Sequence, residues 1–546
     1  MAHTELAEPR AASPGAAARR RRSPSTGSPG PGLAVAGLTL VGVVLRVIVA
    51  RQSIFADELS TYWISAQHGL RGVVSLLYGS AAIKHAEITP PLYFVAAWLT
   101  SHLGHSVLAL RLPSLLAGAL SLPVLYRLGI RIVGRRAALV ATGLTALSPF
   151  MIYYSTEARA YGVMMLLVML STLAMLLAVE TRQARWWVAY AVGSCAAVYT
   201  HLTCVFVLGA QFLWLLWAHP GGRRPAVIAN LGVMAGLAPW TVGFLRDYTS
   251  PTLKILAALS PFSAHDIPII LGHWAIGYPY ANSYASLIHL PGPVALGLLS
   301  VATAIALAGL AAYGRGEHDM RRLATANPSV TLIVVLALAT PVGEALVSTF
   351  GSHIFGVRNL AASWPALALG FAASLMAPAP RWRVAAVGLA VAAFAIAAAL
   401  MLTAPYSRPD YQAAAKLIDG IRPAIHEVVD ETGGLSPGPL TSMDVELRQP
   451  VQLFRAGAPD ERAHPFGFAD PIVPLSDAVA GAVAAARGGM VAVVSNLLPR
   501  GSGIASRREP ATPSFPASYR LLSAHVYPGL VATEVRIYAE PSRLRR

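Results

Sequence analysis

Apolar stretches of about 20 residues recur along the first 400 positions of this 546-residue chain, and each is long enough to cross a bilayer as a helix. The composition agrees, because 55% of the residues are hydrophobic and only 12% are charged. An ordinary soluble domain carries about 25% charged residues. An ordinary soluble enzyme, a disordered chain and a fibrous protein are therefore excluded, and the sequence predicts a polytopic α-helical membrane protein.

Hydropathy and loop charge together predict about eleven transmembrane helices. With the N-terminus in the cytoplasm, every loop that carries paired arginines falls on the cytoplasmic side, as the positive-inside rule requires. The apolar run at 91–104 begins with proline and is short for a span, so we expect an interfacial or re-entrant helix there. The predicted spans are 33–50, 107–127, 136–153, 160–180, 186–201, 202–217, 226–245, 292–313, 329–350, 359–377 and 382–403.

The basic net charge of +16 belongs to the membrane part of the chain. Up to residue 403 there are 27 Lys and Arg against 12 Asp and Glu, whereas the remaining residues carry 15 against 14. Arginine-rich cytoplasmic loops explain this excess, so no nucleic-acid partner is expected. The 2 cysteines indicate neither a disulfide framework nor a zinc site.

The chain divides into three predicted domains: a disordered cytoplasmic tail at 1–32, a transmembrane catalytic module at 33–403 and an extracytoplasmic soluble domain at 404–546. The last region has an ordinary domain size. A helical pattern at 411–421 and strand-like runs at 490–495 and 532–539 predict a small α/β fold.

Acidic residues are rare in the membrane part, which makes each one informative. Asp57 and Glu58 follow the first predicted helix directly. They either cap a solvated helix, or one serves as a general base while the other orients it or holds a divalent cation such as Mg²⁺ or Mn²⁺. Glu157 and Arg159 lie among tyrosines between two long apolar spans. Tyrosines alone fit an aromatic belt, but ionisable groups at such a position indicate a functional site.

A lipid phosphate presented from the bilayer needs cations at the level of the headgroups, and the arginine fork holds two phosphate oxygens at once. Snorkelling to lipid headgroups is the alternative explanation for such cations. The candidates for phosphate binding are Lys84, Arg111, Arg159 and Arg358. The histidines show no metal-binding spacing, and His201 either lines a cavity or is satisfied within the fold.

Several motifs follow one another in a defined order. The Asp-Glu pair is followed by Pro-Pro-Leu-Tyr at 90–93, by Arg-Leu-Pro-Ser at 111–114, by Tyr-Ser-x-Glu-Ala-Arg-x-Tyr at 154–161, by Tyr-Thr-His at 199–201 and by Arg-Asn-Leu at 358–360. This order resembles the glycosyltransferase C (GT-C) superfamily, specifically bacterial family-39-like enzymes related to protein O-mannosyltransferases and to the lipid A aminoarabinose transferase. The chain departs from these relatives at Thr89, where they often carry histidine, and at Asn359, where they often carry tyrosine.

With about eleven predicted transmembrane helices and a small C-terminal extracytoplasmic α/β domain, the predicted fold class is a polytopic α-helical membrane protein of GT-C type. The resemblance covers about 33–403 and implies the GT-C fold for this part of the chain. It further implies an inverting glycosyltransferase in the plasma membrane. Such an enzyme would move a mannose- or arabinose-like sugar from a polyprenyl-phosphate donor to a protein, lipid or polysaccharide acceptor outside the cell. We expect the C-terminal domain at 404–546 to help bind this acceptor. A transporter or flippase of a lipid-linked sugar is the alternative, although transporters tend to show internal repeats that are not evident here. An accessory protein that binds a polysaccharide is a third possibility.

The predicted site draws on these patterns and on the resemblance. The catalytic candidates are Asp57, Glu58 and Glu157, of which the resemblance favours Asp57 as the base; Glu58 and Glu157 are also the candidate metal ligands. The substrate cavity is expected to contain His85, Tyr93, Tyr154, Tyr161 and His201.

Overall fold

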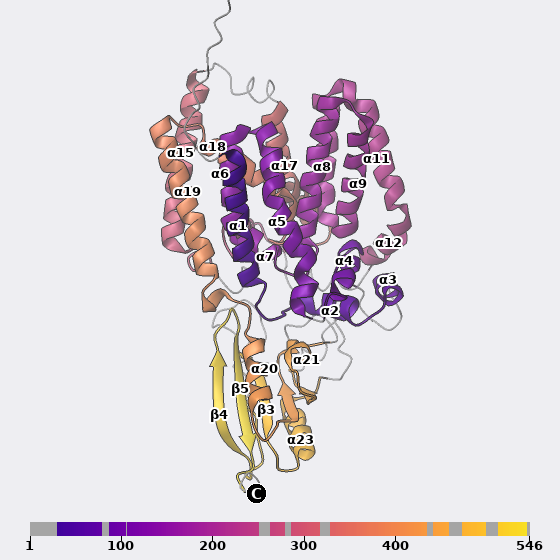
Figure 1. Cartoon of the computed structure of the whole chain (residues 1–546), viewed down its shortest axis with the longest axis vertical. Coiled ribbons are helices and arrows are strands. Elements are labelled where there is room, and N and C mark those ends of the chain that lie inside the picture. Colours follow the sequence, from indigo (N-terminus) through magenta and orange to yellow (C-terminus); the bar gives the residue numbers. More distant parts are fainter. Residues whose placement is uncertain are drawn as a thin grey trace, which may run out of the picture.

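The computed structural model describes residues 30–542 except 79–86, 105, 250–261, 279–285, 317–327, 434–439, 458–471 and 498–511. A long helical bundle leads into a smaller C-terminal domain that contains a five-stranded sheet (Figure 1). The first loop of the bundle and the start of the C-terminal domain meet at one end of the bundle. The ion pairs of the candidate site involve residues of this first loop and of the start of the C-terminal domain.

Each predicted span coincides with one helix or with two or three helical segments in succession. The helices are α1 (Pro31–Val49), α5 (Val107–Ile132), α6 (Gly134–Leu147), α7 (Pro149–Tyr154), α8 (Tyr161–Thr181), α9 (Ala184–Thr200), α10 (Val205–Ala218), α11 (Arg223–Leu237), α12 (Thr241–Thr249), α15 (Gly292–Gly316), α17 (Pro328–Phe350), α18 (Trp364–Leu375) and α19 (Pro380–Met401). Among the described residues, seven helices are long and apolar enough to cross a membrane alone: α1, α5, α8, the segment Pro220–Arg246, and the long apolar parts of α15, α17 and α19. The total of about eleven spans stays a prediction.

Prolines explain where two boundaries differ from the predicted ones. The predicted span at 136–153 is broken at Ser148, whose side chain caps α7 by accepting a hydrogen bond from the Met151 amide. Pro149 follows at the first helical position, where its missing N–H costs nothing, but it cannot continue α6. Pro31 likewise begins α1 two residues before the predicted boundary.

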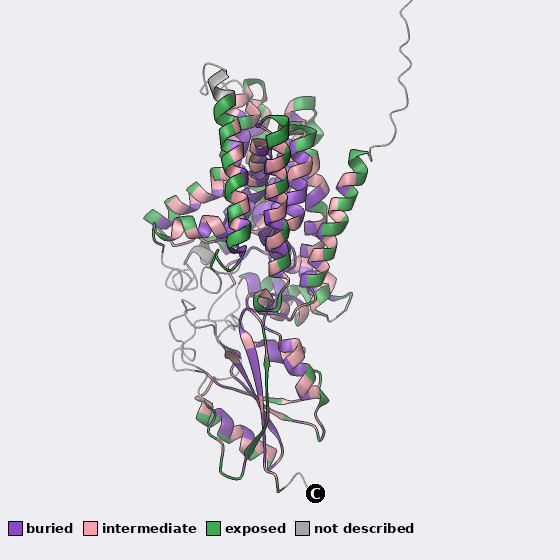
Figure 2. Cartoon of the chain, turned by 90° about the vertical axis from the view of Figure 1, so that its left-hand side faces the viewer, coloured by how far each residue is buried: buried purple, intermediate pink, exposed green. Residues whose placement is uncertain are grey.

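The outer faces of the bundle are apolar, which is expected of helices that contact lipid. Large side chains such as Leu40, Leu213, Leu231 and Leu338 are more than half exposed, and exposed residues run along the outer sides of the helices (Figure 2). Small residues take the buried positions instead, as in α19, where alanines recur at helical spacing. Small residues let helix backbones approach closely, which is the usual way in which membrane helices pack.

Three short helices of the first loop cover the end of the bundle that faces the C-terminal domain. They are α2 (Glu58–Ala66), α3 (Leu70–Tyr78) and α4 (Leu92–Ser101), and all three lie at this end in Figure 1. The 10 residues of α4 span about 15 Å, which is half the thickness of the hydrocarbon core. This short helix agrees with the expectation that 91–104 is not a span.

The C-terminal domain contains the predicted helix, the two predicted strands and three further strands. Its elements are α20 (Tyr411–Gly420), β1 (Glu427–Asp430), α21 (Ser442–Glu446), β2 (Gln452–Arg455), α23 (Leu475–Ala486), β3 (Val491–Leu497), β4 (Arg520–Tyr527) and β5 (Ala532–Ala539). The strand order is β2-β1-β3-β5-β4; β1 is parallel to β2 and β3, and β5 is antiparallel to β3 and β4. The carboxyl ends of the parallel strands therefore point toward the bundle, as the direction of β4 shows in Figure 1.

Candidate functional site

Asp57 and Glu58 stand at the start of α2, directly after a tight turn. Ala56, the residue before them, has a φ of +50°, in the left-handed region that non-glycine residues rarely adopt. This turn sends the two adjacent carboxylates into different surroundings.

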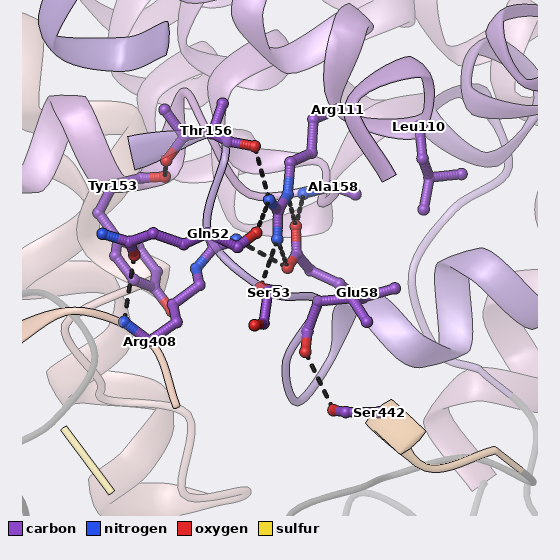
Figure 3. Close-up of polar contacts among 12 residues, drawn as sticks. Gln52, Ser53, Glu58, Leu110, Arg111, Tyr153, Thr156, Ala158, Arg408 and Ser442 are labelled. Atoms are coloured by element: carbon purple, nitrogen blue, oxygen red, sulfur yellow. Dashed lines mark hydrogen bonds and ion pairs between the residues drawn. The ribbon is translucent and has the colours of Figure 1, made fainter. Parts of the chain in front are cut away.

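Glu58 lies at the centre of a buried charge cluster. Its Oε1 accepts hydrogen bonds from Arg111 Nε at 2.7 Å and from the Ala158 amide at 2.7 Å, and its Oε2 accepts from Arg111 Nη2 at 2.6 Å and Arg408 Nη1 at 2.8 Å (Figure 3). Burial alone raises the pKa of this carboxyl, but the two guanidinium groups outweigh it and hold the pKa below its ordinary value. Glu58 is therefore ionised at neutral pH, and both of its carboxylate oxygens accept hydrogen bonds.

Arg111 uses its remaining donors to hold the loop that precedes α2. Its Nη atoms donate to the carbonyl oxygens of Ala50, Gln52 and Ser53 at 2.8, 2.6 and 2.9 Å. With the two bonds to Glu58, every N–H of this completely buried guanidinium group has an acceptor. The geometry assigns Arg111 to holding the loop, in place of the predicted contact with a lipid phosphate.

Arg159 is also paired with a carboxylate, that of Glu87. Its Nη1 and Nη2 donate to the two carboxylate oxygens at 3.0 and 3.2 Å, and the Ser60 and Thr89 hydroxyls donate to the same carboxylate at 2.9 and 2.8 Å. Burial raises the pKa of Glu87, but Arg159 outweighs it and lowers the pKa to about 2. The pairing gives Arg159 a structural partner that the sequence did not predict. Lys84 and His85 lie outside the described residues.

The environment of Asp57 differs from that of Glu58. Asp57 Oδ2 accepts a hydrogen bond from Arg358 Nη1 at 2.6 Å, and the two side chains are 24% and 38% exposed. Arg358 precedes the short helix η4 (Asn359–Ser363), and Asn359 ties this turn down by donating to the Ile354 carbonyl at 2.6 Å. An acid and a cation thus face each other at a partly exposed position.

Glu157 is a buried acid with an unsatisfied oxygen. Its residue is 3% exposed, and Oε2 has no hydrogen-bond partner among the described residues. Burial, followed by the negative charges of Asp57 and Glu58, raises the pKa of Glu157 to about 8. At neutral pH this carboxyl therefore carries a proton that it can donate in a hydrogen bond.

The predicted cavity residues separate into two groups. Tyr154, Tyr161 and His201 form one aromatic chain, with ring centroids 4.8 and 5.0 Å apart. Tyr93 is fully buried instead, and its hydroxyl shares a hydrogen bond of 2.9 Å with Ser114. Tyr93 therefore packs in the core beneath the loop, whereas His201 keeps partial exposure.

The predicted divalent cation does not fit the described residues. Both oxygens of Glu58 are already taken by guanidinium and amide donors. Within the described ranges, no group of three His, Cys, Asp or Glu side chains could hold a metal ion. Glu58 and Glu157 are thus poor metal ligands in this geometry.

Arg408 is a site residue that the sequence analysis did not identify. It follows the last predicted span and was assigned with the soluble domain, yet it reaches Glu58 and lies over the Tyr153 ring at 5.2 Å. A usable signal existed, because the positive-inside rule makes an arginine next to the outer end of a span unusual.

Comparison with known proteins supports the resemblance seen in the motifs. Residues 88–242 match the family model described as dolichyl-phosphate-mannose-protein mannosyltransferase. This segment contains α4 to α11, and with them Arg111, Glu157 and Arg159. Among curated proteins, no sequence matches this chain.

A solved structure shares the fold over most of the chain. The crystal structure of ArnT from Cupriavidus metallidurans bound to undecaprenyl phosphate matches with a TM-score of 0.50 and 15% identity, over 92% of this chain and 97% of that one. The archaeal oligosaccharyltransferase AglB from Archaeoglobus fulgidus, in complex with an inhibitory peptide and a dolichol-phosphate, has a TM-score of 0.48 and 12% identity, over 85% and 69%. The chain is a multi-pass membrane protein with the GT-C fold, and the predicted resemblance is confirmed.

Proposed function

We propose that this protein is an inverting glycosyltransferase that moves a sugar from a polyprenyl-phosphate donor to an acceptor hydroxyl on the extracytoplasmic face of the plasma membrane. The Asp57–Arg358 pair carries this proposal. A general base must contact the acceptor and a cation must contact the leaving phosphate, and these two groups are partly exposed and only 2.6 Å apart. The GT-C fold and the match to a mannosyltransferase family model support the same reaction class.

The proposed reaction is a single displacement. The acceptor oxygen attacks the anomeric carbon as the bond from that carbon to the phosphate oxygen breaks on the opposite face. Asp57 takes the proton of the acceptor hydroxyl, and the polyprenyl phosphate leaves with the bonding electrons. One displacement inverts the configuration of the anomeric carbon, which is an outcome that can be measured directly.

Arg358 is the proposed cation for the leaving phosphate. Its side chain is 38% exposed, whereas those of Arg111 and Arg159 are 0% and 9% exposed and are committed to buried carboxylates. A phosphate that binds Arg358 weakens the ion pair between Arg358 and Asp57. This exchange leaves the Asp57 carboxylate available to the acceptor hydroxyl when the donor is bound. Lys84 remains a further proposed phosphate ligand.

Glu157 has a different proposed role from that of Asp57. Its protonated carboxyl has an unused oxygen, and the negative charges of Asp57 and Glu58 contribute to its raised pKa. A neutral carboxyl acts as a hydrogen-bond donor, so Glu157 is suited to orienting the donor sugar or its phosphate. Tyr161 and His201 stay proposed parts of the wall of the substrate cavity.

The proposed sugar is mannose- or arabinose-like, and the proposed acceptor is a protein, lipid or polysaccharide. A proteoliposome assay with labelled polyprenyl-phosphate sugars tests the function. Transfer of label with inversion, lost in Asp57→Asn, is the expected result. Movement of the intact donor across the bilayer without transfer would contradict the proposal and favour a flippase.

A further inference from the structure

We infer that the C-terminal domain is a positioning element of the transfer step, because it holds the backbone turn that aims Asp57. The inference rests on the proposed function, in which Asp57 is the base. It concerns residues 52–56, here named the aiming loop, which connect α1 to Asp57. The domain contacts the aiming loop through hydrogen bonds and through a shared hydrophobic cluster.

The hydrogen bonds hold three consecutive residues of the aiming loop. The Ile54 amide donates to Glu446 Oε1 at 3.1 Å, and its carbonyl accepts from the Ser442 hydroxyl at 3.0 Å. The side chain of Ser53 accepts from the Gln412 amide at 3.0 Å. Gln52 Oε1 accepts from the amide of Arg408 at 3.1 Å. All four partners follow the last transmembrane helix, and Ser442 is visible below the cluster in Figure 3.

The partners of Ile54 lie on a well-supported helix. Ser442 and Glu446 are the first and last residues of α21, whose N-terminus has a capping box between Thr441 and Asp444. Arg455 at the end of β2 pairs with Asp444 at 3.0 Å. A short helix that is capped and pinned in this way is a rigid support for the loop that it binds.

Packing holds the next two residues of the aiming loop. Phe55 and Ala56 are 2% and 4% exposed, and they belong to the same hydrophobic cluster as Tyr411, Val428 and Ile537 of the C-terminal domain. The end of the loop is thus buried in the core of one face of the sheet. A loop residue packed into another domain's core cannot move independently of that domain.

This support has a conformational consequence. Ala56 has a left-handed backbone, which is unfavourable for an alanine and persists only where the surroundings determine it. Asp57 is the next residue, so the direction of its carboxylate depends on this turn. On the other side, Arg408 of the same C-terminal region binds Glu58. The C-terminal domain therefore holds the chain immediately before and immediately after Asp57.

The double variant Ser442→Ala with Glu446→Ala tests the inference. It removes both bonds to the Ile54 peptide groups and contacts neither Asp57 nor Arg358. Because a misplacement of about 1 Å can cost about 10²-fold in rate, we expect turnover at saturating donor to fall by about 10-fold or more. Donor affinity should stay within about 2-fold. Hydrogen exchange of the Ile54 amide should accelerate, which reports loop geometry independently of activity.

Conservative and matched variants separate positioning from folding. Glu446→Gln keeps an acceptor oxygen for the Ile54 amide and should retain turnover. Ser495→Ala removes a buried hydroxyl of the same domain that bonds Glu431 instead of the loop, and should also leave turnover unchanged. Ala56→Gly keeps the left-handed turn accessible and should stay active, whereas Ala56→Val should not, because a β-branched residue strongly disfavours this conformation.

Two outcomes would overturn the inference while leaving the proposed function intact. One is wild-type turnover in the double variant, whether or not exchange at Ile54 accelerates. The other is a loss of donor affinity that equals the loss of turnover, because that pattern indicates a binding defect and not a misaimed base. Absence of transfer by the wild-type protein would instead contradict the proposed function itself.

Discussion

Asp57 and Glu58 are neighbours in the sequence, yet they lie in opposite environments. Glu58 is fully buried and accepts four hydrogen bonds, from two arginines and an amide. Asp57 is 24% exposed and forms an ion pair with an arginine that is itself 38% exposed. A buried charge whose hydrogen bonds are all made, such as Glu58, organises the fold. A partly exposed charge whose ion-pair partner is also exposed, such as Asp57, is available for chemistry.

The largest expected effect comes from Asp57→Asn. An amide has the size of the carboxylate but cannot take the acceptor proton, so turnover should fall by about 10²–10⁴-fold. The thermal unfolding temperature in detergent and the affinity for the donor serve as controls, and neither should fall. Wild-type turnover in this variant would show that Asp57 is not the general base.

The next effect is a loss of stability in Glu58→Gln. The neutral amide leaves two buried guanidinium groups without a counter-charge, and breaking such a buried pair typically costs about 3–5 kcal/mol. Unfolding in detergent measures this cost, with Asp57→Asn as the exposed control. A Glu58→Gln protein that is stable but inactive would show that Glu58 acts in the reaction. That result would contradict the structural role given to Glu58 here.

Arg358→Ala and Arg159→Ala should differ in kind. Removing a charge-assisted contact to phosphate typically costs about 1.5–3 kcal/mol, so Arg358→Ala should weaken binding of a polyprenyl phosphate by about 10-fold or more. Arg159→Ala should reduce stability instead, because Glu87, whose side chain is only 14% exposed, loses its cation. Direct lipid-binding measurements and unfolding curves on both variants check this. Equal loss of donor affinity in both would assign the phosphate to Arg159 as well.

The smallest effect on turnover at neutral pH should come from Glu157→Gln, because the glutamine amide mimics the protonated carboxyl. Wild-type turnover should decline as Glu157 ionises above its pKa of about 8, and the variant should lack this decline. The stability of the wild-type protein should fall over the same pH range. The pKa of Glu157 is raised from 4.5 to about 8 by folding, so ionising this carboxyl disfavours the folded state. The wild-type protein therefore keeps its full stability below pH 4.5 and loses part of it as the pH rises toward about 8.

Pairs of pH profiles for turnover and for unfolding test this prediction. The variant should match the wild-type protein near pH 5 and exceed it in stability near pH 9. Parallel profiles for the two proteins would show that Glu157 is not the titrating group. Glu157→Ala serves as a control, because it removes both the charge and the hydrogen-bond donor.

Local sequence patterns were enough to predict the membrane part and the candidate acids. Every predicted span coincides with helical structure, because a residue's tendency to leave water for lipid is a local property that a short window of sequence contains. The helix at 411–421 and the strands near 490 and 532 were likewise evident from local patterns. The strands β1 and β2, with 4 residues each, were too short to produce a pattern.

The pairing of the charged side chains, in contrast, depends on the three-dimensional fold. Asp57 and Arg358 are 301 positions apart, and Glu58 and Arg408 are 350 positions apart, so no local pattern indicates either pair. The roles of Arg111 and Arg159 depended on the same information, because an arginine beside a membrane looks alike whether it faces a phosphate or a buried carboxylate. The environment of a charge is a property of everything folded around it, since burial and neighbouring charges set its solvation and its pairing.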